Sequence, residues 1–103
     1  MTDIPIQDPV PAISNLLKAG ETLTVEFKSD VKGLSDRDLV AAVVAMVNTE
    51  GGLILLGVED DGTVTGVQSI HQDITGLVAL IANRTRPSVA VRAEIFDWAT
   101  KES

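Results

Sequence analysis

A short and almost continuously apolar run, Leu53 to Val58, most constrains what this chain can fold into. The run is strand-sized and lacks polar alternation, which predicts a strand buried on both faces at the centre of a sheet. Asp61-Gly62 follows it and is a strong hairpin signal, so residues 63–67 are expected to return as the next strand. The middle of the chain therefore predicts a central β-hairpin.

Two helices are expected before this hairpin. The first covers residues 12–19, after an extended lead-in over residues 1–11, and Gly20 suits the position that follows its last turn. The second covers residues 36–48. Its start is marked by Ser35 as N-cap with Asp38 in the capping-box position, and the Asn48–Gly52 segment (NTEGG) ends it as a scaffold bend in which Gly51 takes a positive φ.

The remaining segments complete a pattern of the α+β class. Residues 22–28 and 89–96 alternate apolar and polar positions and predict half-buried strands. A third helix is expected to begin at Ser69 or His71 and to stop at Pro87. The order is α-β-α-β-β-α-β, in which helices pack on a small mixed β-sheet, and residues 1–103 form a single domain. Because the sequence ends soon after the expected strand 89–96, we expect either a truncated domain or a sheet edge that is left open. An open edge favours a homodimer.

Composition limits the functional classes. Apolar residues make up 45% and charged residues 22% of the chain, as in folded soluble proteins. The chain has no cysteine, no signal-peptide pattern and no apolar run long enough to span a membrane, so a cytoplasmic protein is expected. The formal net charge of −7 disfavours a non-specific DNA coat, but it is compatible with a carboxylate-rich metal site.

Three stretches together carry a family resemblance: ETLTVEFKS from Glu21, VNTEGG from Val47, and LILLGVEDDGTVTGV from Leu53. This constellation resembles the Schlafen/AlbA-like (AlbA_2) domain, which is described as a DNA-binding domain and is also the core of Schlafen-type ribonucleases. The resemblance extends over roughly residues 10–97. It implies DNA or RNA as the partner, while the lack of a membrane-spanning apolar run predicts no membrane partner.

The resemblance also implies an acidic metal site. In Schlafen-type ribonucleases three acidic residues bind the metal, and the matching positions here are Glu21, Glu26 and Asp60. Hard cations such as Mg²⁺ or Mn²⁺ prefer such oxygen ligands and could activate water for phosphodiester cleavage. Lys28 would then contact a phosphate oxygen as part of the catalytic set.

The same residues also have an ordinary structural explanation. Glu26 and Lys28 lie two apart on one strand face and could form a solvated ion pair. Asp60 is a common turn residue before glycine, and Glu21 could simply begin the strand. Both interpretations of this acidic set stay open at the level of sequence.

Basic residues are few. The candidates for contact with a nucleic-acid backbone are Lys28, Lys32, Arg84, Arg86 and Arg92. Arg84 and Arg86 could equally serve the C-terminal dipole of the third helix, and His71 is expected at the surface. The leading hypothesis is a nucleic-acid-binding module, for example in a transcriptional regulator or a helicase-related protein. The alternatives are a metal-dependent endoribonuclease and a non-catalytic dimerisation or assembly domain.

Overall fold

The computed structural model describes residues 9–98. In this range the chain alternates helices and short strands, which confirms the predicted α+β class. The elements are α1 (Pro9–Ala19), β1 (Val25–Lys28), α2 (Asp36–Val47), β2 (Leu53–Leu56), the 3-10 helix η1 (Ser69–Gln72) and α3 (Ile74–Arg84).

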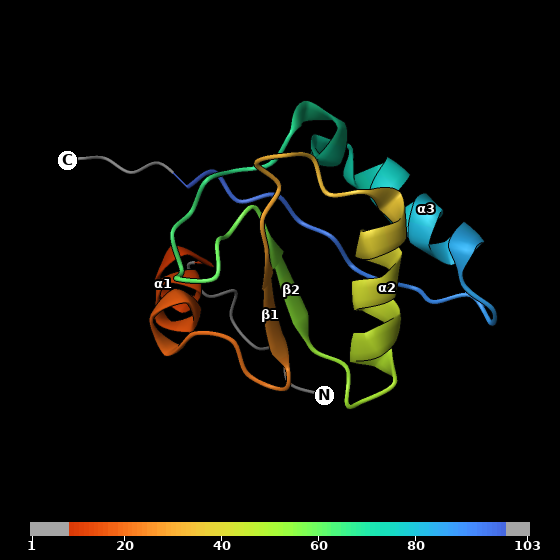
Figure 1. Cartoon of the computed structure of the whole chain (residues 1–103), viewed down its shortest axis with the longest axis horizontal. Coiled ribbons are helices and arrows are strands. Elements are labelled where there is room, and N and C mark those ends of the chain that lie inside the picture. Colours follow the sequence, from red (N-terminus) through yellow and green to blue (C-terminus); the bar gives the residue numbers. More distant parts are fainter. Residues whose placement is uncertain (1–8, 99–103) are drawn as a thin grey trace, which may run out of the picture.

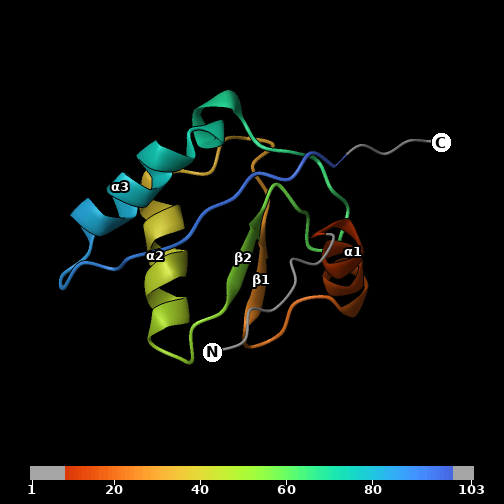
Figure 2. The same cartoon turned by 180° about the vertical axis from the view of Figure 1, so that it is seen from behind.

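The sheet consists of β1 and β2, which run parallel with Val25 opposite Leu53 and Lys28 opposite Leu56. Parallel neighbours need a crossover, and α2 supplies it. Figures 1 and 2 show α1 on one side of the sheet and α2 with α3 on the other. Because the strands are parallel, their carboxyl ends lie at the same end of the sheet.

Buried apolar side chains come both from the sheet and from the helices that cover it. Toward α1, Val25 and Phe27 of β1 are buried with Val58, and partly buried leucines of α1 and β2 pack against them. The other buried apolar side chains belong to α2 and α3, and they are Leu39, Ala42, Val43, Met46 and Ile81. The sheet therefore has one apolar face, toward α1, and a second face that can carry polar side chains.

The start of α2 agrees with its sequence signals. Ser35 is the N-cap, and its hydroxyl accepts a hydrogen bond from the amide of Asp38 at 3.1 Å. Asp36 and Asp38 lie in the first turn, where negative charge is favourable.

The end of α2 is a tight scaffold bend, as predicted. Gly51 has φ of 78° and donates its amide hydrogen to Met46 O, to which the Thr49 hydroxyl also donates. Gly52 has φ of 151°, and a Cβ at this position would collide with Thr24 O and with Met46 Sδ. Only glycine fits where the chain turns into β2 against the residue before β1.

The N-terminal expectations need two corrections. Residues 9–11 belong to α1 rather than to an extended lead-in, because proline is tolerated in the first turn of a helix, where the amide hydrogens are unpaired; residues 1–8 lie outside the described residues. The first strand begins at Val25, not at residue 22. Leu23 lies in a turn and is 87% exposed.

The central hairpin is shorter than predicted. β2 ends at Leu56, and the return segment 63–67 contributes only an antiparallel bridge between Val58 and Val64. Gly57 causes this change of direction: its φ is 90°, and its carbonyl accepts from the amides of Thr65 and Gly66. β2 is also neither central nor fully buried, because it is one strand of a two-stranded sheet and Leu53 is 43% exposed.

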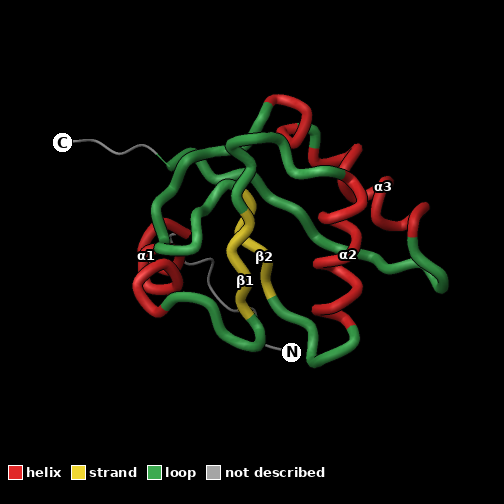
Figure 3. The backbone as a smooth tube through the Cα atoms, in the orientation of Figure 1, coloured by secondary structure: helices red, strands yellow, loops and turns green. Residues whose placement is uncertain are grey.

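The expected last strand, 89–96, is also not a strand. The third helix ends at Arg84, before Pro87, and the chain then continues as an extended loop to residue 98 (Figure 3). Val89, Val91 and Ala93 are half-buried while Ala90, Arg92 and Glu94 are exposed. The predicted alternation is present, but no described strand pairs with it. Among the described residues, no helix has the length and hydropathy needed to cross a membrane.

Candidate functional site

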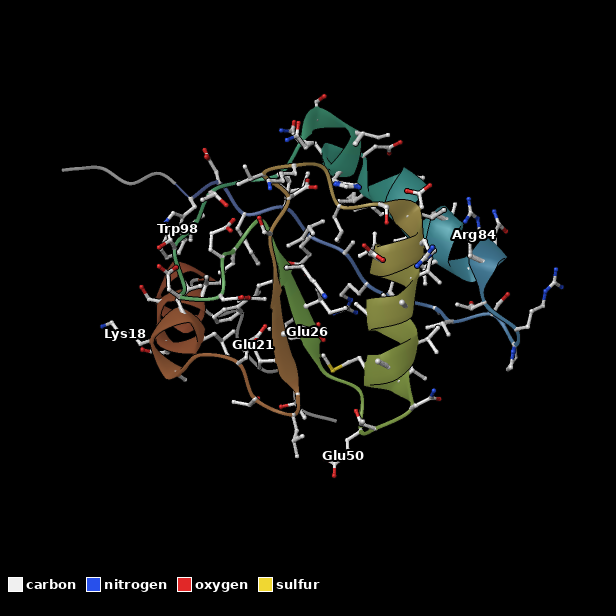
Figure 4. The ribbon with its side chains drawn as sticks, viewed as in Figure 1. Lys18, Glu21, Glu26, Glu50, Arg84 and Trp98 are labelled. Carbon is white, nitrogen blue, oxygen red and sulfur yellow. The ribbon has the colours of Figure 1, made fainter. Side chains whose placement is uncertain are left out.

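Glu26 and Lys28 lie on the second face of the sheet, the one turned away from α1. Burial alternates along β1, so Val25 and Phe27 point into the core and these two charged side chains point to the opposite side. Lys28 Nζ lies 3.2 Å from Glu26 Oε2, and about a third of each side chain is exposed. Figure 4 shows Glu26 on the side of the strands that faces α2. The two charges therefore partly neutralise each other on a half-buried surface.

Glu21 completes the outer edge of β1. Its Oε2 accepts a hydrogen bond from the Phe27 amide at 2.8 Å. The neighbouring Thr22 exchanges backbone hydrogen bonds with Val25 across the 22–25 turn. The Glu21 carboxylate and the 22–25 turn together accept hydrogen bonds from the β1 amides that this edge strand would otherwise leave unpaired. One role of Glu21 is thus to close this edge.

Asp60 lies in the exposed turn that follows β2. Its neighbour Asp61 accepts a hydrogen bond from the Thr63 amide at 2.9 Å, and hydrogen bonds from Thr63 hold the pKa of Asp61 below its ordinary value. Glu59 accepts from the Thr65 hydroxyl at 2.5 Å. These carboxylates are held by the turn itself, as expected of acidic residues before a glycine.

The three predicted metal ligands can be tested against these contacts. Glu21 uses one oxygen on the Phe27 amide, Glu26 is paired with Lys28, and Asp60 is exposed in the turn. Across residues 9–98, no three acidic or histidine side chains come close enough to hold a metal ion. In this arrangement the residues do not fit Mg²⁺ or Mn²⁺, and no chemical step through a metal follows from it.

A shallow hollow lies at the carboxyl ends of the two strands. It has a volume of about 400 Å³, and its polar lining comes from the loop after β1, the start of α2 and the turn after β2. The polar lining residues are Ser29, Lys32, Ser35, Asp38 and Glu59. Lys28 precedes this loop as the last residue of β1, and its carbonyl accepts from the Gly57 amide at 2.7 Å. Crevices beyond the carboxyl ends of parallel strands are common ligand sites.

The other predicted cations are distributed over the molecule. Arg84 ends α3 and lies 3.8 Å from Asp36 Oδ2 of α2, with more than half of its side chain exposed. Arg86 lines a second, smaller hollow with residues of α2, and Arg92 is exposed on the extended segment. Figure 4 shows Lys18 on α1 and Arg84 on α3 at opposite ends of the molecule. The structure brings Lys28 and Lys32 to one end of the sheet and leaves the three arginines on other segments.

A buried acidic residue was not predicted from the sequence. Asp30 is 1% exposed, and it accepts hydrogen bonds from the amides of Leu34 and Gln68 and from Nδ1 of His71, at 2.6, 2.7 and 2.7 Å. His71 is only 5% exposed, which corrects its expected surface position. Burial by itself would raise the pKa of Asp30, but the hydrogen bonds from His71, Leu34 and Gln68 outweigh burial and lower it.

Asp30 joins the loop that lines the hollow to the segment before α3. The Gln68 side chain strengthens this link by donating to the carbonyls of Asp30 and Val31. Residues 30 and 71 are far apart in sequence, and each looks like a surface residue when read alone. Only the spacing of Asp30 four residues before Leu34, which lets the aspartate side chain accept a hydrogen bond from a following backbone amide, could have signalled its role.

Comparison with known protein families gives one match. The family model described as Schlafen, AlbA_2 matches residues 21–102. The match covers most of the chain, so the protein belongs to this family, as the resemblance of its three motifs predicted. No solved structure matches the chain. Membership of this family is consistent with a nucleic-acid-related domain.

Proposed function

We propose that this domain binds nucleic acid at the carboxyl end of its parallel strands. The observation that carries the proposal is the hollow that Lys32, Ser29 and Ser35 line, next to Lys28, in a chain that belongs to the Schlafen, AlbA_2 family. Lysine and serine side chains are ordinary donors to phosphate oxygens. Such a module would serve a transcriptional regulator or a helicase-related protein of the cytoplasm.

The net charge limits how this binding works. With a formal charge of −7, the molecule as a whole repels a polyanion, and Asp38 and Glu59 line the same hollow. Binding must therefore come from short-range contacts of Lys28 and Lys32 rather than from long-range steering. Its salt dependence should be shallow: two neutralised phosphates on duplex DNA give a slope of about −2 in log K against log salt.

Fluorescence anisotropy with labelled duplex DNA and single-stranded RNA tests this proposal over a series of salt concentrations. Lys32→Ala should weaken binding to the preferred nucleic acid and make the salt slope shallower by about one phosphate contact. Lys18→Ala is the matched control, because this lysine is exposed on α1, away from the hollow. Equal losses for the two variants, or no binding of either nucleic acid by the wild type, would contradict the proposal.

The described contacts favour binding over metal-dependent RNA cleavage, because Glu21 and Glu26 are engaged in the fold and form no three-ligand group with Asp60. The endoribonuclease alternative is tested by adding Mn²⁺ or Mg²⁺ and following amide shifts near Glu26 and Asp60. Metal-dependent shifts there, together with RNA cleavage that Glu26→Ala abolishes, would replace the binding module with an enzyme.

A further inference from the structure

The extended segment after α3 has the properties of a strand without a partner. Residues 90–98 make no hydrogen bond to any residue in the described range, although they continue in one general direction from the side of α2 toward α1 (Figure 2). Backbone donors and acceptors that have no partner in an extended chain are a template for pairing with another strand.

The two faces of this segment differ in character. Val89, Val91 and Ala93 are half-buried against the protein, while Ala90, Arg92 and Glu94 are exposed. Farther along, Ile95 is 53% and Phe96 is 40% exposed, so apolar side chains remain uncovered at its end. A partner that pairs with this strand has to match small aliphatic side chains on one face and a cation followed by an anion on the other.

We propose that this partner is a second copy of the same segment, paired antiparallel across a twofold axis at Ala93. In this register Arg92 lies opposite Glu94 of the second copy, and the symmetry repeats the pair, so that two ion pairs flank the axis. Val91 then lies opposite Ile95 of the second copy on the other face. The segment is self-complementary in both charge and apolar character.

Neighbouring registers lack this match. Centring the axis on Arg92 places two arginines opposite each other, and centring it on Glu94 places two glutamates opposite each other, which is destabilising in an antiparallel pair. A shift by one residue would place half-buried positions opposite exposed ones. Among these neighbouring registers, the one centred on Ala93 is the best matched in charge, and it specifies which residues approach each other.

Disulfide trapping tests this register directly, because the chain has no cysteine of its own. In Ala93→Cys the two introduced thiols face each other at a Cα separation of about 4.5–5.5 Å, within the range a disulfide bridges. In the matched control Ala90→Cys, the same register separates the two introduced cysteines by six residues along the strand, which places their thiols roughly 20 Å apart. Under mild oxidation Ala93→Cys should form a covalent dimer readily and Ala90→Cys should not.

Charge exchange provides a second, independent test by sedimentation velocity over a range of protein concentration. Arg92→Glu or Glu94→Arg alone should raise the dissociation constant of the dimer by roughly tenfold or more, and the double exchange should restore it. Lys18→Glu and Glu50→Arg make the same charge changes at exposed sites elsewhere and should leave the dimer unchanged. A wild type that stays monomeric at every concentration, or equal trapping of both cysteine variants, would overturn the proposal.

Discussion

The substitution Asp30→Asn tests the buried link between the loop after β1 and the segment before α3. The variant keeps the size of the side chain but converts one acceptor oxygen into an amide group that donates. In the wild type, Oδ1 accepts from the Leu34 amide, and Oδ2 accepts from both the Gln68 amide and His71 Nδ1. In either orientation, the asparagine places its NH₂ group against at least one backbone amide hydrogen.

The expected cost follows from this mismatch. A buried donor left without an acceptor costs about 1–3 kcal/mol, and the remaining hydrogen bonds lose the extra strength that a charged acceptor gives. We therefore expect the free energy of unfolding to fall by about 2–4 kcal/mol. For a domain of this size such a loss lowers the midpoint of thermal unfolding by roughly 10–30 °C.

Circular dichroism during urea and thermal unfolding measures this effect. The control is Asp61→Asn, because Asp61 is an exposed carboxylate that accepts one backbone hydrogen bond in a turn that asparagine also favours. Its stability should change by no more than about 0.5 kcal/mol. If Asp30→Asn and Asp61→Asn unfold at the same midpoint, the buried link does not stabilise the fold as argued.

Three further predictions concern stability. The pKa of Asp30 is lowered from 3.8 in the folded protein, so the difference in stability between wild type and Asp30→Asn should be complete above that pH. The difference should become smaller as the pH falls through the folded-state pKa. A difference that grows in acid would contradict the sign of the shift. Gly52→Ala should lower the free energy of unfolding by about 1–3 kcal/mol, more than Gly51→Ala does, because of these two positions only residue 52 would bring the new methyl group against backbone and side-chain atoms. Equal losses for the two variants in urea unfolding would refute this steric reason. Glu21→Ala should lower the free energy of unfolding by about 1 kcal/mol, because it leaves the Phe27 amide unpaired. The control Glu50→Ala, at an exposed residue, should leave stability unchanged. Indistinguishable urea midpoints for the two variants would argue against the edge-closing role of Glu21.

Local signals predicted the helices and the bend after α2. Ser35 and Asp38 marked the start of α2, and the glycines after it marked the bend, because each of these effects acts within a few residues. The family resemblance rested on the same local motifs, and the family match over residues 21–102 confirms it.

The limits of the sheet could not be predicted in the same way. Alternation reports which side chains face the protein, and residues 89–93 do alternate in burial, but it carries no information on whether a neighbouring strand is present. The start of β1 was misplaced for a related reason: Leu23 continues the alternation in sequence, while the backbone turns at Thr22 to pair with Val25. Pairing depends on residues distant in the chain.

The candidate site illustrates the same limit. Glu26 and Lys28 were recognised as a pair on one strand face, and the ion pair between them is present. The contact of Asp30 with His71 joins residues 41 positions apart, and no single-sequence pattern relates them. The hollow beside Lys32 likewise arises only when the loop after β1 and the turn after β2 come together.

The most direct test of the central claim is a titration of the ¹⁵N-labelled domain with a short oligonucleotide, followed through its amide resonances. Binding at the carboxyl end of the strands predicts the largest shifts in residues 29–35 and at Glu59, which line the hollow, and small shifts on α1. A spectrum that stays unchanged at saturating oligonucleotide, or shifts confined to α1, would contradict the proposed site.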